Sequence, residues 1–279
     1  MRYLPASDGV SLAVHEHGGH GRPILFCHAT GLHGAVWEPL SAALGPELER
    51  WAVDFRGHGA SVVPPDHPLP WSAFRDDALA VVDDLGLEPG TCVGVGHSLG
   101  GAALLMAEQA RPGTFAGLWL FEPIVPPPAQ AARFSGSNPL ADGAERRRPS
   151  FPSFADALAN YASKPPLNVA RADALHAYVR HGFVAAEDGA VHLACRPADE
   201  ARTFRGAGID GIFERLGAVG CPVRIVVGGE AFGPVAFAPE IARALPRAEL
   251  ERHPHLSHFG PLQGPDELAT SVKAFASTL

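Results

Sequence analysis

One stretch limits what this chain can fold into more than any other. In CVGVGHSLGGAALLMAEQA, residues 92–110, a short apolar run reaches a serine flanked by glycines and passes directly into an alanine- and leucine-rich segment. A short apolar run of this kind predicts a buried strand, and the longer segment after it predicts a helix. The sequence therefore predicts a strand, a tight turn that holds Ser98, and a helix.

Ser98 is the residue of this stretch that could carry chemistry. The pattern Gly96-x-Ser98-x-Gly100 has little weight alone in a chain with 31 glycines, so its meaning depends on the predicted strand before it and helix after it. A sharp strand-to-helix turn exposes a serine hydroxyl above a sheet, and glycines relieve the crowding that such a turn creates. We predict that Ser98 is a nucleophile, and the alternative is an ordinary helix N-cap.

Strand and helix patterns alternate along much of the chain. Apolar runs at residues 12–14, 24–27, 51–53, 92–95, 118–121, 223–227 and 248–252 predict strands. One-sided apolar patterns at residues 37–44, 74–85 and 268–279 predict helices. This alternation is typical of an α/β protein with a mostly parallel central sheet flanked by helices.

The pattern changes between residues 123 and 220. Proline clusters and a polar run interrupt short helical patterns there, and the strand pattern returns only after residue 221. We expect one split core domain, residues 1–122 and 221–279, with a mostly helical cap or lid inserted at residues 123–220. Two apolar cap faces are expected to cover a pocket above Ser98, formed by Leu175, Tyr178 and Phe183 and by Ile209, Ile212, Phe213 and Leu216.

Charge and cysteine content narrow the range of partners. The net charge of −8 disfavours binding to a phosphate backbone, so we expect a small-molecule substrate and no nucleic acid. The four cysteines form no CxxC pair, and neither a metal nor an organic cofactor is indicated. No apolar run has the length of a signal peptide or a bilayer span, which leads us to expect a cytoplasmic protein without membrane contact. The oligomeric state cannot be read from the sequence.

A serine hydroxyl needs a base that removes its proton, and the chain has 14 histidines. His258 follows the predicted strand at residues 248–252 and precedes the terminal helix. Loops at that end of the sheet are placed where a serine at the turn can be reached. We predict that His258 is the general base, with His255 and His253 in the same loop as alternatives.

Three motifs in one order resemble the α/β-hydrolase-fold family, and the resemblance covers nearly all of the chain. Residues 96–101 are similar to the nucleophile elbow of the family, and residues 54–61, Asp-Phe-Arg-Gly-His-Gly-Ala-Ser, resemble its D-x-R-G-x-G-x-S loop. Ser257-His258-Phe259 is similar to its late histidine segment. The resemblance implies that the loop beginning at Asp54 is structural rather than catalytic.

The resemblance also implies an oxyanion hole made by two backbone amides. One is the N–H of Leu99, directly after the serine, and the other comes from the loop after residues 24–27. That loop reads His28-Ala29-Thr30 where the family usually has His-Gly, and by position Thr30 supplies the second amide. Two roles stay open for the Thr30 hydroxyl, namely a further hydrogen bond or the cap of a helix that starts near Ala35.

A catalytic serine and histidine are completed by an acid that orients the histidine, and the three together form a catalytic triad. The position of this acid in the sequence departs from the family pattern. The family usually has a G-x-x-D segment after the penultimate strand, but residues 228–233 contain Glu230 and no aspartate, with Phe232 at the position of the acid. Glu122 ends the strand after the elbow strand, and some haloalkane dehalogenases and lipases of this fold are similar in placing the acid there. A carboxylate at the end of an apolar strand is costly to bury without a partner. We predict Glu122 as the acid and keep Glu230 as the alternative.

Together these features predict a serine hydrolase that cleaves an ester-type acyl bond of a small, largely apolar substrate through Ser98, His258 and Glu122. Serine at the elbow argues against a dehalogenase or epoxide hydrolase. Thioesterase, lactonase and carbon–carbon bond hydrolase activities stay open, since the fold does not choose among them. A slow-turnover binding protein of the same fold is a second class. We expect the cap run Arg146–Arg148 to be a solvated loop, with attraction of a substrate carboxylate or phosphate as the alternative.

Overall fold

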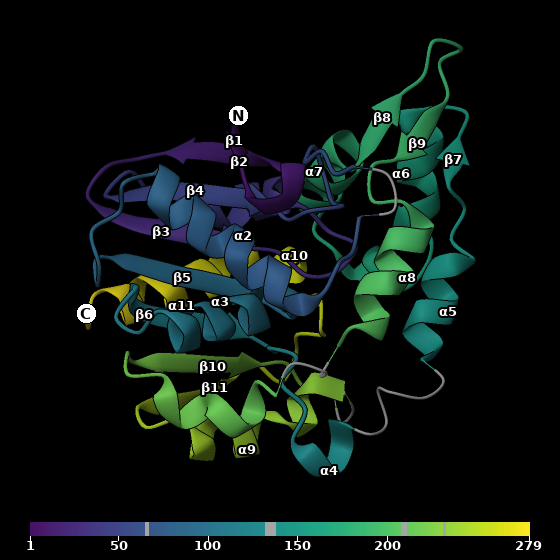
Figure 1. Cartoon of the computed structure of the whole chain (residues 1–279). Helices are drawn as coiled ribbons and strands as arrows, with labels where there is room; N and C mark the ends of the chain where they lie inside the picture. The colour runs from purple at the N-terminus through teal and green to yellow at the C-terminus, as the bar shows by residue number, and fades with distance from the viewer. Residues whose placement is uncertain (65–66, 132–137, 208–210, 231–232) are drawn as a thin grey trace.

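An eight-stranded sheet runs through the centre of the protein in the order β1-β2-β4-β3-β5-β6-β10-β11 (Figure 1). The computed structural model describes residues 1–64, 67–131, 138–207, 211–230 and 233–279. β1 and β2 pair antiparallel, β2 pairs antiparallel with β4, and all further pairs are parallel. The strands are β1 (Arg2–Pro5), β2 (Ser11–Gly18), β3 (Arg22–Cys27), β4 (Leu48–Asp54), β5 (Cys92–His97), β6 (Phe115–Phe121), β10 (Val223–Val227) and β11 (Ala248–Arg252).

Helices cover both faces of this sheet. One face carries α2 (Trp71–Asp84), α3 (Leu99–Ala110) and α9 (Ala238–Ala244), which lie in front of the sheet in Figure 1. The other face carries α1 (Glu38–Ala43) and α11 (Pro265–Ala276). The mostly parallel α/β architecture that the sequence predicts is therefore confirmed.

β5 and β6, in the middle of the sheet, form because their sequences consist almost entirely of apolar residues and glycine. β5 is buried at every residue, as expected of a parallel strand covered by helices on both sides. The helices are instead one-sided: in α2 the side chains of Phe74, Ala78 and Val81 are fully buried, while Asp83 and Asp84 are exposed. β1 was not predicted, because only Leu4 of its four residues is buried.

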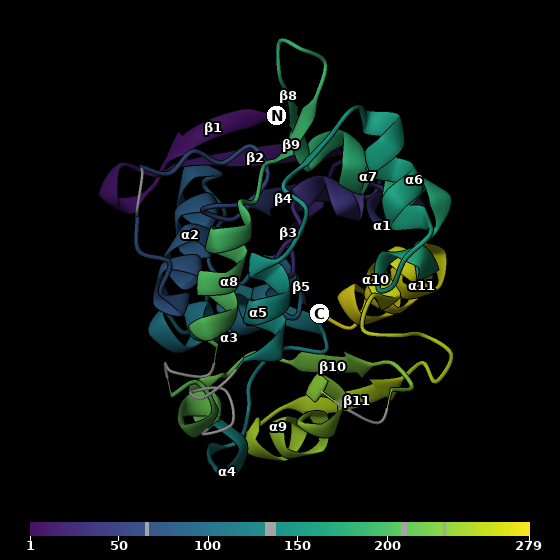
Figure 2. The ribbon, with the colours of Figure 1, turned by 90° about the vertical axis from the view of Figure 1, so that its right-hand side faces the viewer.

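The segment between β6 and β10 is not exclusively helical. Its strands β7 (Ser150–Phe151), β9 (Val191–Leu193) and β8 (Phe183–Ala185) form a small antiparallel sheet in that order. Helices α5 (Pro139–Glu145), α6 (Phe154–Ala162), α7 (Ala172–His181) and α8 (Pro197–Arg205) lie beyond the carboxyl ends of the parallel strands, at the side that faces the viewer in Figure 2. The segment also contains α4 (Pro128–Ala131), η3 (Leu167–Val169) and η4 (Phe213–Ala218).

The two apolar faces expected in this segment pack in different hydrophobic clusters. Leu175, Tyr178 and Phe183 are buried in the hydrophobic cluster on the α1 and α11 side of the sheet. Ile212 and Leu216 belong to the opposite cluster, in which η4 contacts α3 and α9. The expectation that this second face covers a pocket above Ser98 is therefore wrong, because it packs in the core of the protein. Ile209 lies outside the described residues.

No helix in the described ranges is both long enough and apolar enough to cross a membrane.

Candidate active site

Ser98 lies on a strained turn between β5 and α3. Its φ is 55° and its ψ is −112°, and its side chain makes no capping hydrogen bond to the helix that follows. A Cβ on Gly96 would stand 2.7 Å from the Cα of Gly101, and one on Gly100 would collide with the carbonyl oxygen of Cys27. The glycines around Ser98 are thus required by close backbone contacts, and the turn presents the serine at the end of the sheet.

Glu122 binds the imidazole of His258. Its Oε2 lies 2.6 Å from Nδ1 of His258, and because a carboxylate can only accept, Nδ1 carries the hydrogen. Oε1 accepts a second hydrogen bond from the backbone N–H of Gly228, at 2.8 Å. Glu122 is fully buried and has a φ of 45°, and its own N–H donates to the Val226 carbonyl. The side chain is therefore fixed between the ends of β6 and β10 with both oxygens occupied.

The other residues considered for acid and base lie elsewhere. Glu230 is exposed and forms neither a hydrogen bond nor an ion pair with His258 in the described part of the chain, and Phe232 lies outside the described residues. His255 binds Glu267, and His253 lies between Glu251 and Glu267. These two histidines are therefore engaged with surface glutamates rather than with Glu122.

His97 connects the serine turn to the histidine loop. Its Nε2–H donates to the backbone carbonyl of His258 at 2.8 Å, and the two rings lie 4.9 Å apart between centroids. Burial and the neighbouring His258 lower the pKa of His97, which keeps its ring neutral. Within the described residues Ser98 Oγ forms no hydrogen bond with His258, and such bonds commonly tighten only in the complex with substrate. Sequence reasoning missed this role, although His97 stands between Gly96 and Ser98 inside the elbow motif.

The two backbone amides that the resemblance assigns to the oxyanion hole, the N–H of Leu99 and that of Thr30, have no hydrogen-bond acceptor among the described residues. Leu99 begins α3, where the first amides of a helix have no acceptor within it. The Thr30 hydroxyl does not cap the next helix, because η2 (Gly34–Trp37) has His33 at its N-cap and no side-chain cap.

Asp54 fixes the loop that contains Thr30. Its Oδ1 accepts from the backbone N–H of Gly34 at 2.6 Å and from His15 at 2.9 Å, and its Oδ2 accepts from the N–H of Ala60 at 2.8 Å. Burial opposes the charge of Asp54, but these hydrogen bonds lower its pKa well below the ordinary value. The carboxylate is thus occupied by the backbone that it holds, which is a structural task.

Arg147 corrects the expectation of a solvated arginine run. Its Nη1 donates to the carboxylate of Glu200 on α8. Its Nη2 donates to the hydroxyls of Tyr161 on α6, at 2.9 Å, and of Tyr178 on α7, at 2.6 Å. Arg147 is therefore an internal cation that connects three helices of the inserted segment.

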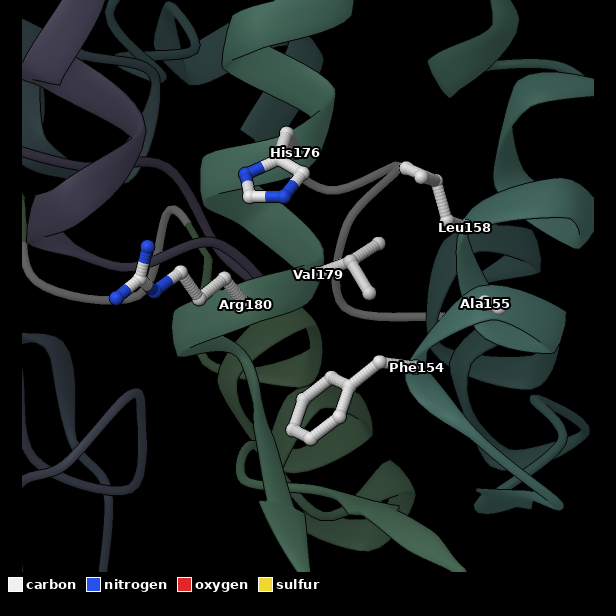
Figure 3. Close-up of a pocket in the computed structure, with 6 residues that line it drawn as sticks. All are labelled: Phe154, Ala155, Leu158, His176, Val179 and Arg180. Atoms are coloured by element: carbon white, nitrogen blue, oxygen red, sulfur yellow. The ribbon is translucent and has the colours of Figure 1, made fainter.

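A cavity of about 380 Å³ lies between α6 and α7 (Figure 3). It is lined by Phe154, Ala155, Leu158, His176, Val179 and Arg180. None of these residues belongs to the serine turn, the histidine loop or the loop of Thr30. The cavity is consequently separate from the group of residues around Ser98.

A family model classifies this arrangement. Residues 24–271 match the model of the alpha/beta hydrolase family. The chain belongs to this family. The match runs from β3 into α11 and so includes Ser98, Glu122 and His258. The curated proteins that match part of the chain include lipases and methyl ester esterases.

The curated relatives match part of the chain. This chain is 36% identical to Lipase LipV of Mycobacterium tuberculosis over 123 residues. The matched stretch covers 42% of this chain and 43% of that protein. Over 131 residues it is 36% identical to the monoglyceride lipase of Homo sapiens, covering 45% of this chain and 43% of the lipase. The matched stretch thus spans less than half the length of either relative.

Among solved structures, the crystal structure of E-2-(acetamidomethylene)succinate hydrolase is similar over 99% of this chain and 98% of the other. The TM-score is 0.82 and the sequence identity is 24%. At this identity the likeness shows the fold alone.

Proposed function

We propose that this protein is a hydrolase that cleaves an ester-type acyl bond of a small, largely apolar substrate through a triad of Ser98, His258 and Glu122. The observation that carries the proposal is the 2.6 Å hydrogen bond between His258 and the buried carboxylate of Glu122. A carboxylate in this position fixes the tautomer in which Nε2 of His258 can accept a proton. Ser98 occupies the strained turn at the same end of the sheet.

The chemistry follows from these positions. Ser98 Oγ bonds to the carbonyl carbon while its proton passes to Nε2 of His258, and Glu122 stabilises the imidazolium that forms. The amides of Leu99 and Thr30 donate to the oxyanion. Collapse of this intermediate breaks the bond to the leaving alcohol, which takes the proton from Nε2. Water then repeats the sequence on the acyl-enzyme and releases the acid.

We also infer that residues 123–220 form a cap over the site, inserted into a core of residues 1–122 and 221–279. The helices α5, α6, α7 and α8 lie beyond the carboxyl ends of the strands, where the catalytic residues of this proposal lie. Caps in that position exclude water and shape the acyl pocket. η4 is the exception within the segment, because it packs on α3 and α9.

Replacement of Ser98 by alanine tests the proposal. Loss of a triad serine costs on the order of a millionfold in the serine proteases, so we expect hydrolysis of 4-nitrophenyl butyrate to fall at least about ten-thousandfold. Labelling by a fluorophosphonate should disappear in the same variant. Ser277→Ala is the matched control, since Ser277 is exposed near the carboxyl end of the chain.

Near-normal turnover by a folded Ser98→Ala protein would contradict the nucleophile assignment. Rapid labelling of the unaltered protein without sustained turnover would instead favour a slow-turnover binding protein. A panel of oxygen esters, thioesters and lactones then separates the acyl hydrolase classes by their kcat/KM values.

A further inference from the structure

The cluster around Arg147 lies against the loop that is proposed to hold the oxyanion. Gly31 is the residue directly after the proposed amide donor of this loop and has a φ of 76°. A Cβ on Gly31 would stand 2.5 Å from Oε1 of Glu200 and 3.4 Å from Nη1 of Arg147. In the same loop, Nε2–H of His33 donates to the backbone carbonyl of Tyr178 at 3.0 Å. The guanidinium of Arg147 is therefore close to where the carbonyl of a bound ester would lie.

The cluster has hydrogen-bond donors that its own members do not use. Among the described residues, no acceptor is bonded to the Nε–H of Arg147. The hydroxyls of Tyr161 and Tyr178 each accept from Arg147, so each keeps its own hydrogen to donate, and neither donates within the described part of the chain. The side chain of Arg147 is 19% accessible, which leaves room for a ligand to approach.

We propose that Arg147, Tyr161 and Tyr178 bind a carboxylate at the far end of the acyl chain of the substrate. A planar guanidinium with neighbouring hydroxyl donors is the kind of group that binds a carboxylate through several hydrogen bonds. This inference rests on the proposed function, because it requires the ester carbonyl at the amide of Thr30. It changes the proposed substrate from a largely apolar ester to a half-ester of a dicarboxylic acid, in which only the stem between the two polar ends is apolar.

The length of the stem follows from the position of Gly31. Consecutive Cα atoms lie about 3.8 Å apart, so the guanidinium is a short acyl chain away from the amide of Thr30. A succinyl group, with two methylene groups between its carbonyl carbons, is suited to this separation. Longer stems would have to fold back or shift the ester carbonyl away from the serine.

Glu200 allows binding of a carboxylate to be distinguished from a purely structural role of the cluster. Its carboxylate holds Nη1 of Arg147, but its charge repels an anionic substrate. Removal of the charge on Glu200 should therefore favour a substrate that carries a carboxylate, whereas removal of the charge on Arg147 should disfavour it. A brace that only fixes the fold would be weakened by either change.

The test compares three esters of similar size: monoethyl succinate, ethyl succinamate and ethyl butyrate. They present a carboxylate, a neutral amide and a methyl group at the same distance from the ester carbonyl. Release of ethanol is followed for the unaltered protein and for Arg147→Gln, Glu200→Gln and Tyr161→Phe. Arg146→Gln is the matched control, because it removes the same charge from the same run at an exposed residue. Circular dichroism and thermal melting establish that each variant is folded.

The measured quantity is the ratio of kcat/KM for monoethyl succinate to that for ethyl butyrate. We expect Arg147→Gln to lower this ratio on the order of ten- to a hundredfold, as for loss of a hydrogen bond to a charged group. Glu200→Gln should raise it severalfold, and Tyr161→Phe should lower it by a smaller factor than Arg147→Gln. Ethyl succinamate should respond less than monoethyl succinate to each change, and Arg146→Gln should leave the ratio unaltered.

Failure of the carboxylate site and failure of the proposed function give different results. If hydrolysis depends on Ser98 but the ratio stays the same in Arg147→Gln and Glu200→Gln, the carboxylate site is refuted and the proposed function stands. If both variants lose activity equally on all three esters, the cluster is a structural brace, which also overturns the inference. If Arg147→Gln does not fold, Tyr161→Phe replaces it in the test, because this change removes one oxygen and keeps the ring. An unaltered ratio in Tyr161→Phe would then refute the carboxylate site. Hydrolysis that persists in Ser98→Ala would instead refute the proposed function itself.

Discussion

Replacement of Glu122 by glutamine tests the triad acid, because glutamine has almost the same shape and only one acceptor oxygen. Glu122 accepts from two fixed donors, Nδ1–H of His258 and the backbone N–H of Gly228. If the amide oxygen of the glutamine turns to Gly228, its NH2 group faces His258. That arrangement requires a bare Nδ1, and the hydrogen then sits on Nε2, where it blocks acceptance of the Ser98 proton. If the oxygen turns to His258, the buried N–H of Gly228 loses its acceptor.

The magnitude follows from these two orientations. An unsatisfied buried N–H costs about 1–3 kcal/mol, so neither orientation reproduces the original site. The corresponding change of acid to amide in a serine protease triad lowers kcat about ten-thousandfold, which is roughly 5.5 kcal/mol of transition-state stabilisation. We expect Glu122→Gln to lower kcat at least about a hundredfold and to leave KM within about threefold, since the charge interaction is made mainly in the transition state.

Steady-state hydrolysis of a 4-nitrophenyl ester measures both constants. The matched control is Glu230→Gln, which removes the same charge from an exposed glutamate in the loop after β10. We expect the control to retain kcat within about threefold, and thermal melting should show that both variants are folded. A larger loss in Glu230→Gln than in Glu122→Gln would refute the reasoning and place the acid after β10, as in most of the family.

Gly100→Ala should lower the free energy of unfolding by at least about 3 kcal/mol in urea denaturation, because its Cβ would collide with the carbonyl oxygen of Cys27. Gly143→Ala, with nothing near its Cβ position, is the control, and equal losses in both would contradict the close contact. His253→Gln should destabilise the protein more at pH 6 than at pH 9, by up to about 1 kcal/mol. Burial opposes the charge of His253, but its bonds to Glu267 and a second glutamate raise its pKa. The stabilisation from these bonds is complete below the ordinary pKa of histidine and is lost as the pH rises through the raised pKa of His253. A loss of stability that does not depend on pH would contradict this prediction.

Much of the fold could be predicted from local sequence because its signals are local. The run of residues 92–96 contains only apolar residues and glycine, since β5 is covered on both faces, and the helix after Ser98 starts where the glycines permit a sharp turn. Glu122 could be proposed for a related reason. It is a charged residue directly after an apolar strand, and such a residue is expected to have a buried partner. The partner, His258, lies 136 residues away, and its distance from Glu122 could not be derived from the sequence.

The inserted segment was harder to predict. β7 has only two residues, which is too short to show the alternation that marks a strand. Arg147 looked like part of a solvated run because its neighbours are charged and its partners lie far along the chain. Glu200 is 53 residues away and Tyr178 is 31 residues away. Only the packing of the helices places these groups together, and helix packing is not encoded in a local pattern.

Ser98 and Glu122 both have a positive φ, which is rare for residues other than glycine, and the sheet explains how both are kept. Apart from Asp8, they are the only non-glycine residues in the described ranges with a positive φ, which costs an ordinary residue roughly 1–2 kcal/mol. Each is held by a hydrogen bond to the end of the next strand: the N–H of Ser98 donates to the Phe121 carbonyl at 3.0 Å, and that of Glu122 to the Val226 carbonyl at 2.8 Å. Strain of this kind persists only where the surrounding structure enforces it. The same hydrogen bonds therefore enforce the strain and set the spacing between the two side chains, so the precision of the proposed site comes from the register of β5, β6 and β10 rather than from the segment above it.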